Sequence, residues 1–386
     1  MKNTTELITT CVLIISIQFS LKAEKSNTSD IIGQWGGKIE YAERLEAINI
    51  QFNETDNSIT GNITFVYDKK VNKLENIQII DSALSFVCKY DKGKLFFKGK
   101  IINGTYSGQL TVMTPRVNKL EGKFELNKGE LIQKDELFLE RLIKYADYNN
   151  QVVNTERTFV YMDSSDINLR KLRNRYNLDS VSGSDSEILS LINLMKWVHN
   201  VLPYNGHCGD IGLVNSLNLI ESKKAQESGI NCLMKSTILN EVYLAMGFNS
   251  RVVHCLPKGN NHIESHFITI VYSLELKKWI YMDPSVGAYL MDKNKNLLSI
   301  QEFRDKLIKG EKVLINNDAL LPNDLYLHYM SKNLFRFNCA YVSGFNDDTK
   351  DNASCSLYPK LYLESDMKDS RENIISNPEY FWATPE

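Results

Sequence analysis

A helix followed by a β-hairpin in the second half of the chain constrains the fold most. Apolar residues recur at helical spacing over 232–246, and Gly247 follows as a helix stop. Residues 265–272 and 279–282 are rich in β-branched and aromatic side chains, and the polar residues 274–278 lie between them. These patterns predict one helix and two adjacent antiparallel strands, so this part of the chain is expected to belong to the α+β class.

Three residues with complementary chemistry lie on these elements. Cys232 begins the predicted helix, His266 lies in the first strand and Asp283 ends the second strand. A thiol with a pKa of about 8.5 is only a few per cent ionised at neutral pH, and the partial positive charge of a helix N-terminus favours the thiolate. Together the residues predict a site in which the thiolate attacks, the histidine transfers a proton and the carboxylate orients the imidazole ring.

Each of the three residues also has a simpler interpretation. A buried cysteine in a helix is commonly a small core residue. A strand histidine can be structural, and the pair Asp283 and Pro284 can mark only the end of a strand. The order of the three residues, and the elements that carry them, favour one shared catalytic site over three separate structural roles.

The residues around this helix and hairpin resemble one known superfamily. The matching segments are 229–232 (Gly-Ile-Asn-Cys), 239–253, His266 and 278–284, and the resemblance extends from about Asp166 to the C-terminus. In this order they resemble the transglutaminase-like superfamily, which has a papain-like cysteine enzyme core. The resemblance implies a cysteine nucleophile that acts on an amide bond, because the superfamily includes transglutaminases, proteases, peptide N-glycanases and members without activity.

The resemblance also directs attention to residues near the nucleophile. His207 lies in an upstream loop, where it could donate to an oxyanion or contact substrate, or could be an ordinary surface histidine. Asn231 is predicted to share the substrate or oxyanion role, with the Cys232 backbone N–H as the other donor. Arg251 is expected to stabilise the fold through an ion pair and to take no part in catalysis.

The composition argues against several classes of function. The formal net charge is −2 and there is no polybasic run, so neither nucleic acid nor an anionic membrane is an expected partner. The six histidines form no His-x-x-x-His motif, and there is no Cys-x-x-Cys and no Gly-rich phosphate loop. We therefore expect no metal and no other cofactor. Cys339 and Cys355 flank a polar loop and are the first candidates for a disulfide.

Residues 24–131 have an all-β pattern, in which short apolar runs alternate with turn residues. They predict an antiparallel barrel or sandwich, with Asn103-Gly104 as one hairpin turn. The Gly-Gln-Trp-Gly pattern at 33–36 resembles the lipocalin-like modules that precede bacterial exported hydrolases. Such a module could bind ligand or substrate, or could be a stabilising spacer, which is the preferred interpretation. The expected strands are 45–52, 59–65, 84–90, 94–98, 104–112 and 120–126.

The N-terminus has the pattern of an export signal. Lys2 precedes an apolar run over 7–19, and Ala23 is a plausible cleavage position. The run is too short to span a membrane, and no other segment reaches the roughly 18 apolar residues that a spanning helix needs. We therefore expect a mature protein with no membrane span that is periplasmic, on the cell surface or secreted.

The expected organisation has four parts: a signal peptide (1–23), the β-rich lipocalin-like domain (24–131), a connecting helix (132–150) and the transglutaminase-like domain (151–386). Within the last part, residues 184–187 (Ser-Asp-Ser-Glu) have the form of a capping box that begins a helix ending before Pro203.

The sequence thus predicts an exported cysteine enzyme that acts on amide bonds through a thioester intermediate. Hydrolysis by a protease, amidase or deglycosylase is preferred over cross-linking, and the expected substrate is a peptide, protein or glycopeptide. The alternative is a binding or scaffold protein that keeps the fold without turnover.

Overall fold

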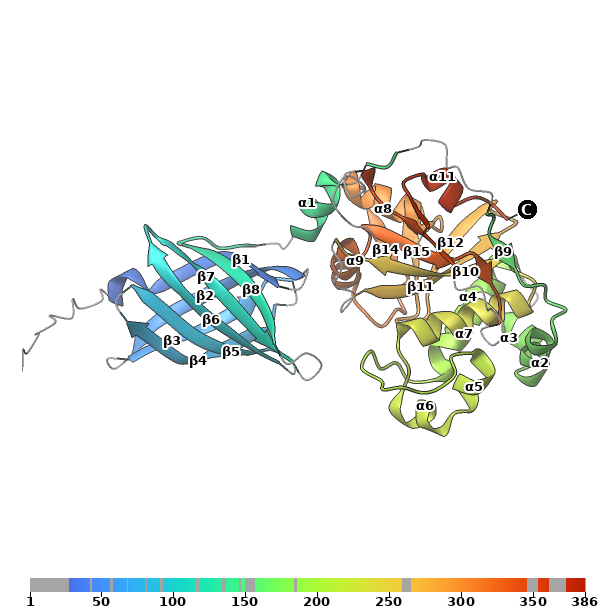
Figure 1. The fold of residues 1–386 in the computed structure, drawn as a ribbon, viewed down its shortest axis with the longest axis horizontal. Coiled ribbons are helices and arrows are strands. Elements are labelled where there is room, and N and C mark those ends of the chain that lie inside the picture. The colour runs from blue at the N-terminus through green and yellow to red at the C-terminus, as the bar shows by residue number, and fades with distance from the viewer. Residues whose placement is uncertain are drawn as a thin grey trace, which may run out of the picture.

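The computed structural model describes residues 28–385 apart from several short segments, and it contains a β-barrel followed by an α+β domain (Figure 1). The predicted signal peptide lies outside the described residues. None of the helices in the described part is long and apolar enough to cross a membrane. The segments that are not described are 42–43, 56–57, 68, 81, 91–92, 115–118, 134–136, 146, 150–156, 184–185, 259–264, 346–352 and 361–372.

The first part is a closed antiparallel barrel, in which each strand pairs with the next and the last strand pairs with the first. This confirms the predicted antiparallel barrel. The hairpin turn at Asn103 and Gly104 has φ values of 51° and 78°, as a type I′ turn requires. A short 3₁₀ helix, Thr28–Asp30, precedes the barrel, whose strands are β1 (Gly33–Tyr41), β2 (Arg44–Thr55), β3 (Ser58–Phe65), β4 (Val71–Ile80), β5 (Ala83–Tyr90), β6 (Gly93–Ile102), β7 (Thr105–Met113) and β8 (Leu120–Lys128).

Aromatic side chains fill the interior of this barrel. Trp35 and Tyr106 are fully buried, and the rings of Phe86 and Phe97 stack with their centroids 4.7 Å apart. Inward-facing residues alternate with exposed ones along the strands, as a barrel with one solvated face requires. Because side chains occupy this interior, the barrel favours the interpretation as a spacer.

The second part is built on an eight-stranded sheet with the order β14-β13-β12-β11-β10-β15-β17-β18. Its pairings are antiparallel except for β17 with β18. The strands of this sheet are β10 (Ser250–Leu256), β11 (His266–Ser273), β12 (Lys278–Asp283), β13 (Ala288–Asp292), β14 (Val313–Ile315), β15 (Arg336–Ala340), β17 (Ser354–Leu357) and β18 (Asn373–Ile375). Two further strands, β9 (Val160–Tyr161) and β16 (Val342–Ser343), form a separate parallel pair. The helices are α1 (Leu137–Lys144), α2 (Ile167–Arg175), α3 (Leu178–Ser182), α4 (Glu187–Val201), α5 (Ser216–Glu221), α6 (Lys223–Ser228), α7 (Cys232–Ala245), α8 (Ile300–Ile308), α9 (Asn323–Lys332) and α11 (Pro378–Phe381).

Two apolar cores lie on the two faces of this sheet. Ile270 and Tyr281 pack into the core that contains residues of α1, α8 and α9. Val271 and Ile280 point the other way, into the core that contains residues of α2, α4 and α7. This alternation confirms the predicted hairpin of β11 and β12. The predicted fold class is also confirmed, because an antiparallel barrel precedes an α+β domain whose cysteine-bearing helix packs against a sheet.

Helix α7 is enclosed on all sides. Every residue from Met234 to Ala245 is buried, including the polar residues Lys235 and Glu241, although the sequence predicted only one apolar face. The helix ends where expected, because Gly247 has φ = +85°, a left-handed conformation that favours glycine. A helix enclosed in this way holds its first residue in a fixed place.

The buried Lys235 ammonium group stabilises the end of α4. Its Nζ donates hydrogen bonds to the carbonyl oxygens of Val198 at 2.9 Å, of His199 at 2.7 Å and of Leu202. These carbonyls lie at the C-terminus of α4, where the helix dipole favours a cation. Burial lowers the pKa of Lys235 to about 8.

The start of α4 differs from the sequence prediction. Ser186 is the N-cap, and its side chain accepts a hydrogen bond from the Leu189 backbone N–H at 3.2 Å. Residues 184–185 lie outside the described part of the chain, but the N-cap is two residues later than a box at Ser184 would require, so the predicted capping box at 184–187 is wrong. The end of the helix at Val201, before Pro203, is confirmed.

The connecting helix α1 packs into the second domain. Leu142 is fully buried in the core that also contains Tyr326 and Phe303, and Phe138 is 4% exposed. The barrel also contacts this domain, since the rings of Tyr67 and His328 stack with centroids 4.7 Å apart. Helix α1 is thus a structural part of the α+β domain.

Two sequence expectations near the C-terminus are wrong. Arg251 has no carboxylate partner among the described residues; its guanidinium lies 4.2 Å and 4.4 Å from the ring centroids of Phe159 and Trp279. Aromatic faces thus take the place of the expected ion pair. The candidate disulfide is not formed: no S–S bond joins Cys339 and Cys355, although the two residues face each other in register.

Candidate active site

The chain enters α7 through a tight bend that places Cys232 at the helix N-terminus. Gly229 has φ = +76°, and a Cβ there would lie 2.9 Å from the Pro203 carbonyl oxygen, so a side chain would not fit. Asn231 is the N-cap, and its Oδ1 accepts a hydrogen bond from the Met234 backbone N–H at 3.1 Å. Cys232 follows as the first helical residue and is partly exposed, which gives a substrate access to the thiol.

His266 and Asp283 meet at the ends of neighbouring strands, as the sequence predicted. The distance from His266 Nε2 to Asp283 Oδ2 is 2.7 Å, and the side chains are 3% and 0% exposed. His266 Nδ1 is buried and is not hydrogen bonded to any residue in the described part of the chain. Because Nε2 is hydrogen bonded to the carboxylate, Nδ1 is the ring nitrogen that is available to exchange a proton with the Cys232 thiol.

Two further groups hold the Asp283 carboxylate. The Tyr326 hydroxyl donates to Oδ2 at 2.7 Å, and the Ser285 backbone N–H donates to Oδ1 at 2.9 Å. The Tyr281 hydroxyl is in turn hydrogen bonded to the Tyr326 hydroxyl. Each oxygen of the carboxylate is thus fixed, and the carboxylate fixes the imidazole ring.

The electrostatics of the site favour an ion pair between thiolate and imidazolium. Burial raises the pKa of the Cys232 thiol, but the His266 ring and the Phe267 backbone N–H outweigh burial and hold the pKa below its usual value. Burial opposes the charged form of His266 as well, but the charge of Asp283 and its hydrogen bond raise the pKa of the ring. Burial raises the pKa of Asp283, and its interactions with His266, Tyr326 and Ser285 lower it further than burial raises it.

The structure brings Cys232, His266 and Asp283 together, and the substrate or oxyanion role of Asn231 and His207 stays a prediction. Asn231 caps α7 with its side chain. His207 is exposed in the loop after Pro203, where its backbone N–H donates to Asn205 Oδ1 at 2.9 Å. Its predicted contact with an oxyanion or substrate stays a prediction.

Helix α9 supplies two residues that the sequence analysis missed. Tyr326 binds Asp283, and the Tyr329 ring lies edge-on to the His266 ring with centroids 5.4 Å apart. Both tyrosines are separated from Asp283 in the sequence by more than one helix or strand, and no sequence motif identifies them. In the described part of the chain, no three His, Cys, Asp or Glu side chains are grouped to hold a metal ion.

Comparisons with known proteins add little to this description. No family model and no curated protein match the sequence. Among solved structures, the chain is similar to one from Cytophaga hutchinsonii that is provisionally assigned as a cysteine protease. The two share 8% identity over 76% of this chain and 87% of that chain, with a TM-score of 0.25. A likeness this weak carries no argument, so the site is interpreted from its own geometry.

Proposed function

We propose that this chain is a cysteine enzyme that cleaves an amide bond through a thioester intermediate. The observation that carries the proposal is a partly exposed Cys232 at a helix N-terminus beside the buried pair of His266 and Asp283. The Nδ1 atom of His266 has no hydrogen-bond partner among the described residues. Nucleophile, proton carrier and orienting carboxylate are the three parts that such a reaction needs.

The reaction begins with attack of the Cys232 Sγ thiolate on the amide carbonyl carbon. The carbonyl oxygen becomes an oxyanion, and the Cys232 backbone N–H is proposed as one donor that stabilises it. His266 then donates its Nδ1 proton to the leaving amine, the carbon–nitrogen bond breaks and a thioester remains. Water attacks this thioester, His266 takes one water proton, and the acid product leaves with regeneration of the thiolate.

We further propose a peptide, protein or glycopeptide substrate, with water as the acyl acceptor in preference to an amine. The position of His207 in an exposed loop is compatible with a contact to such a substrate. Export to the periplasm, the cell surface or the medium is part of the same proposal, and it rests on the apolar run over 7–19.

The proposal is tested by trapping the thioester. The protein is mixed with p-nitrophenyl acetate, quenched in acid and digested, and the acetylated cysteine is identified by mass spectrometry. We expect acetyl on Cys232, no such adduct in Cys232→Ser, and slow acylation in His266→Ala. Cys208 is the matched control, because it is the other partly exposed thiol among the described cysteines. Equal acetylation of both thiols would contradict the proposal and favour a scaffold without turnover.

A further inference from the structure

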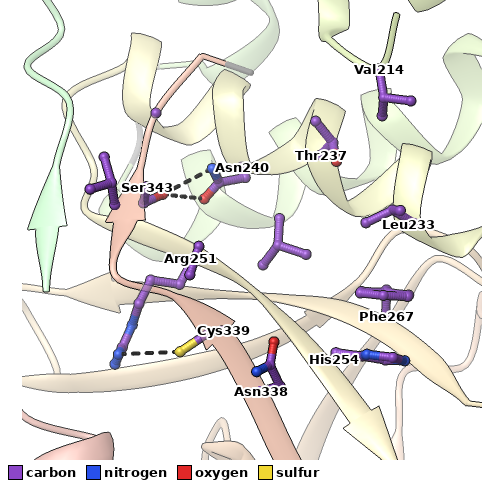
Figure 2. Close-up of a pocket in the computed structure, with 14 residues that line it drawn as sticks. Val214, Leu233, Thr237, Asn240, Arg251, His254, Phe267, Asn338, Cys339 and Ser343 are labelled. Atoms are coloured by element: carbon purple, nitrogen blue, oxygen red, sulfur yellow. Dashed lines mark hydrogen bonds between the residues drawn. The ribbon is translucent and has the colours of Figure 1, made fainter. Parts of the chain in front are cut away.

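A pocket of about 410 Å³ lies along α7 on the side of the sheet that faces this helix (Figure 2). Leu233, Thr237 and Asn240 line it from α7, at the spacing of one helical face. Residues of β10, β11 and β15 line the opposite wall. We refer to this pocket as the α7 groove.

The α7 groove adjoins the nucleophile. Leu233 directly follows Cys232 in the chain, and Phe267 directly follows His266, and both Leu233 and Phe267 line the groove. The Phe267 backbone N–H also interacts with the Cys232 thiol. The lining of the groove thus begins at the residues next to Cys232 and His266, and the Phe267 backbone connects the groove with the Cys232 thiol.

The groove offers flat and aliphatic surfaces. The His254 and Phe267 rings stack with centroids 3.9 Å apart and an interplanar angle of 9°, which makes one flat platform. Leu233 and Val214 lie above this platform in Figure 2. Val342 adds a further aliphatic side chain to the lining. Burying apolar groups of a ligand against surfaces of this kind contributes a favourable free energy of binding.

One polar group is directed into the groove. The Asn338 side-chain Nδ2 donates to the Oγ atoms of Ser354 at 2.9 Å and Ser356 at 2.8 Å. These bonds fix the amide, and Figure 2 shows its oxygen turned toward the space below α7. A fixed carbonyl-type oxygen in this position can accept a hydrogen bond from a peptide N–H.

Apart from a histidine, the described lining residues present no accessible charged side chain to the groove. The lining includes one arginine, Arg251, but this side chain is 1% exposed. Its guanidinium points away from α7, donates to the Phe381 carbonyl oxygen at 3.0 Å and lies against Phe159 and Trp279. A charged ligand side chain would thus lose water without gaining an ion pair.

The length of the groove matches a short stretch of peptide. From Leu233 to Asn240 a helix rises about 10 Å, at 1.5 Å per residue. An extended chain covers about 3.3–3.6 Å per residue, so about three residues fit this length.

We propose that the α7 groove binds an extended, uncharged and largely apolar segment of about three residues in a peptide substrate, next to the amide that Cys232 attacks. This inference rests on the proposed function and adds the substrate class. Leu233, Phe267 and Asn338 act as positioning residues that contact the substrate away from the reacting atoms.

The test measures how peptides protect Cys232 from iodoacetamide. Acetyl-leucyl-phenylalanyl-valinamide at millimolar concentration is expected to slow alkylation about threefold, the protection given at twice the dissociation constant. Acetylated tri-aspartyl and tri-lysyl amides are expected to protect no more than buffer. Equal protection by the charged and the uncharged peptides would overturn the inference.

Two variants fill the groove from different elements, α7 and β16, so that a folding failure in one leaves the other. Thr237→Trp and Val342→Trp are each expected to abolish protection by the uncharged peptide, measured against the unprotected alkylation rate of the same variant. Leu274→Trp is the matched control, since Leu274 is 73% exposed in the β11–β12 turn. Protection that survives in both groove variants would overturn the inference.

The proposed function and the groove can fail separately. Calorimetric titration of Cys232→Ser with the same three peptides measures binding without a reactive thiol. An unreactive Cys232 together with selective binding of the uncharged peptide would contradict the proposed enzymatic activity and support the proposed peptide binding by the groove. A reactive Cys232 without selective binding would support the proposed enzymatic activity and contradict peptide binding by the groove.

Discussion

The Tyr326 hydroxyl donates a hydrogen bond to Asp283 Oδ2 at 2.7 Å, the same oxygen that lies 2.7 Å from His266 Nε2. Tyr326 is in α9, and Asp283 ends β12, so a helix on one face of the sheet fixes the carboxylate of the site. The proposed catalytic pair of His266 and Asp283 therefore depends on the packing of α9 against the sheet.

Tyr326→Phe is expected to lower the free energy of unfolding by about 1.5–3 kcal/mol, because the variant removes a buried hydrogen bond to a charged group. Tyr326 is one cause of the lowered pKa of Asp283. A lowered carboxyl pKa contributes stability above the unfolded pKa and loses it as the pH falls through the folded pKa. In the variant the Asp283 pKa should lie closer to its unfolded value, so the acid loss should be smaller and should be complete at a higher pH.

Urea unfolding across the acid range, around the usual Asp pKa of about 3.9, measures both effects. Tyr272→Phe in β11 is the matched control and should leave the pH dependence unchanged. If the two variants behaved alike, the Tyr326 hydroxyl would have no role in holding Asp283.

Asp283→Asn is expected to reduce turnover roughly ten- to a thousandfold, since the imidazolium loses its charged partner. The fully buried side chain accepts bonds from His266, Tyr326 and Ser285, and an amide nitrogen in place of Oδ2 would face two of these donors. We also expect a loss of about 1–3 kcal/mol in unfolding free energy. Full turnover in this variant would exclude an orienting role for the carboxylate.

Lys235→Met is expected to lower the free energy of unfolding by about 3 kcal/mol or more, because three buried carbonyl oxygens lose their donor. Lys223→Met is the matched control, with a side chain that is 88% exposed, and should leave the unfolding free energy unchanged within error. Urea unfolding measures both variants. A loss below about 1 kcal/mol for Lys235→Met would show that water replaces the ammonium group.

A fragment that begins at residue 133 keeps α1 and is expected to fold with a reactive Cys232. A fragment that begins at residue 151 lacks the fully buried Leu142 and should be less stable by at least the roughly 2–5 kcal/mol of a buried leucine deletion. Circular dichroism and urea unfolding compare the two. Equal stability of both fragments would show that α1 is dispensable for the core.

Local patterns in the sequence were sufficient to predict α7 and the hairpin that follows it. The helix ends at Ala245 before Gly247, and β11 begins at His266, because the glycine stop and the β-branched run act over a few residues. The barrel was predicted from six strands, and β1 and β4 were not among them. Strand β4 has one buried residue, Leu74. Its alternation is too weak to recognise in a sequence.

The parts of the site that were missed depend on tertiary contacts. Tyr326 reaches Asp283 from a helix 43 residues further along the chain. Arg251 was expected to find a carboxylate, but the fold brings it to the aromatic faces of Phe159 and Trp279. At α4 the sequence offered two serines within one turn, either of which suits an N-cap, and the cap in the structure is Ser186.

The most direct test of the proposed catalytic site is the pH dependence of Cys232 alkylation by iodoacetamide, followed by mass spectrometry in the native protein and in His266→Ala. Because the pKa of Cys232 is held below its usual value by the His266 ring, the native rate should rise with an inflection below the ordinary thiol pKa of about 8.5. In the variant the inflection should move up to that value or above it, since burial then acts without the imidazolium. An ordinary inflection in the native protein, or the same profile in both proteins, would contradict a catalytic site at Cys232.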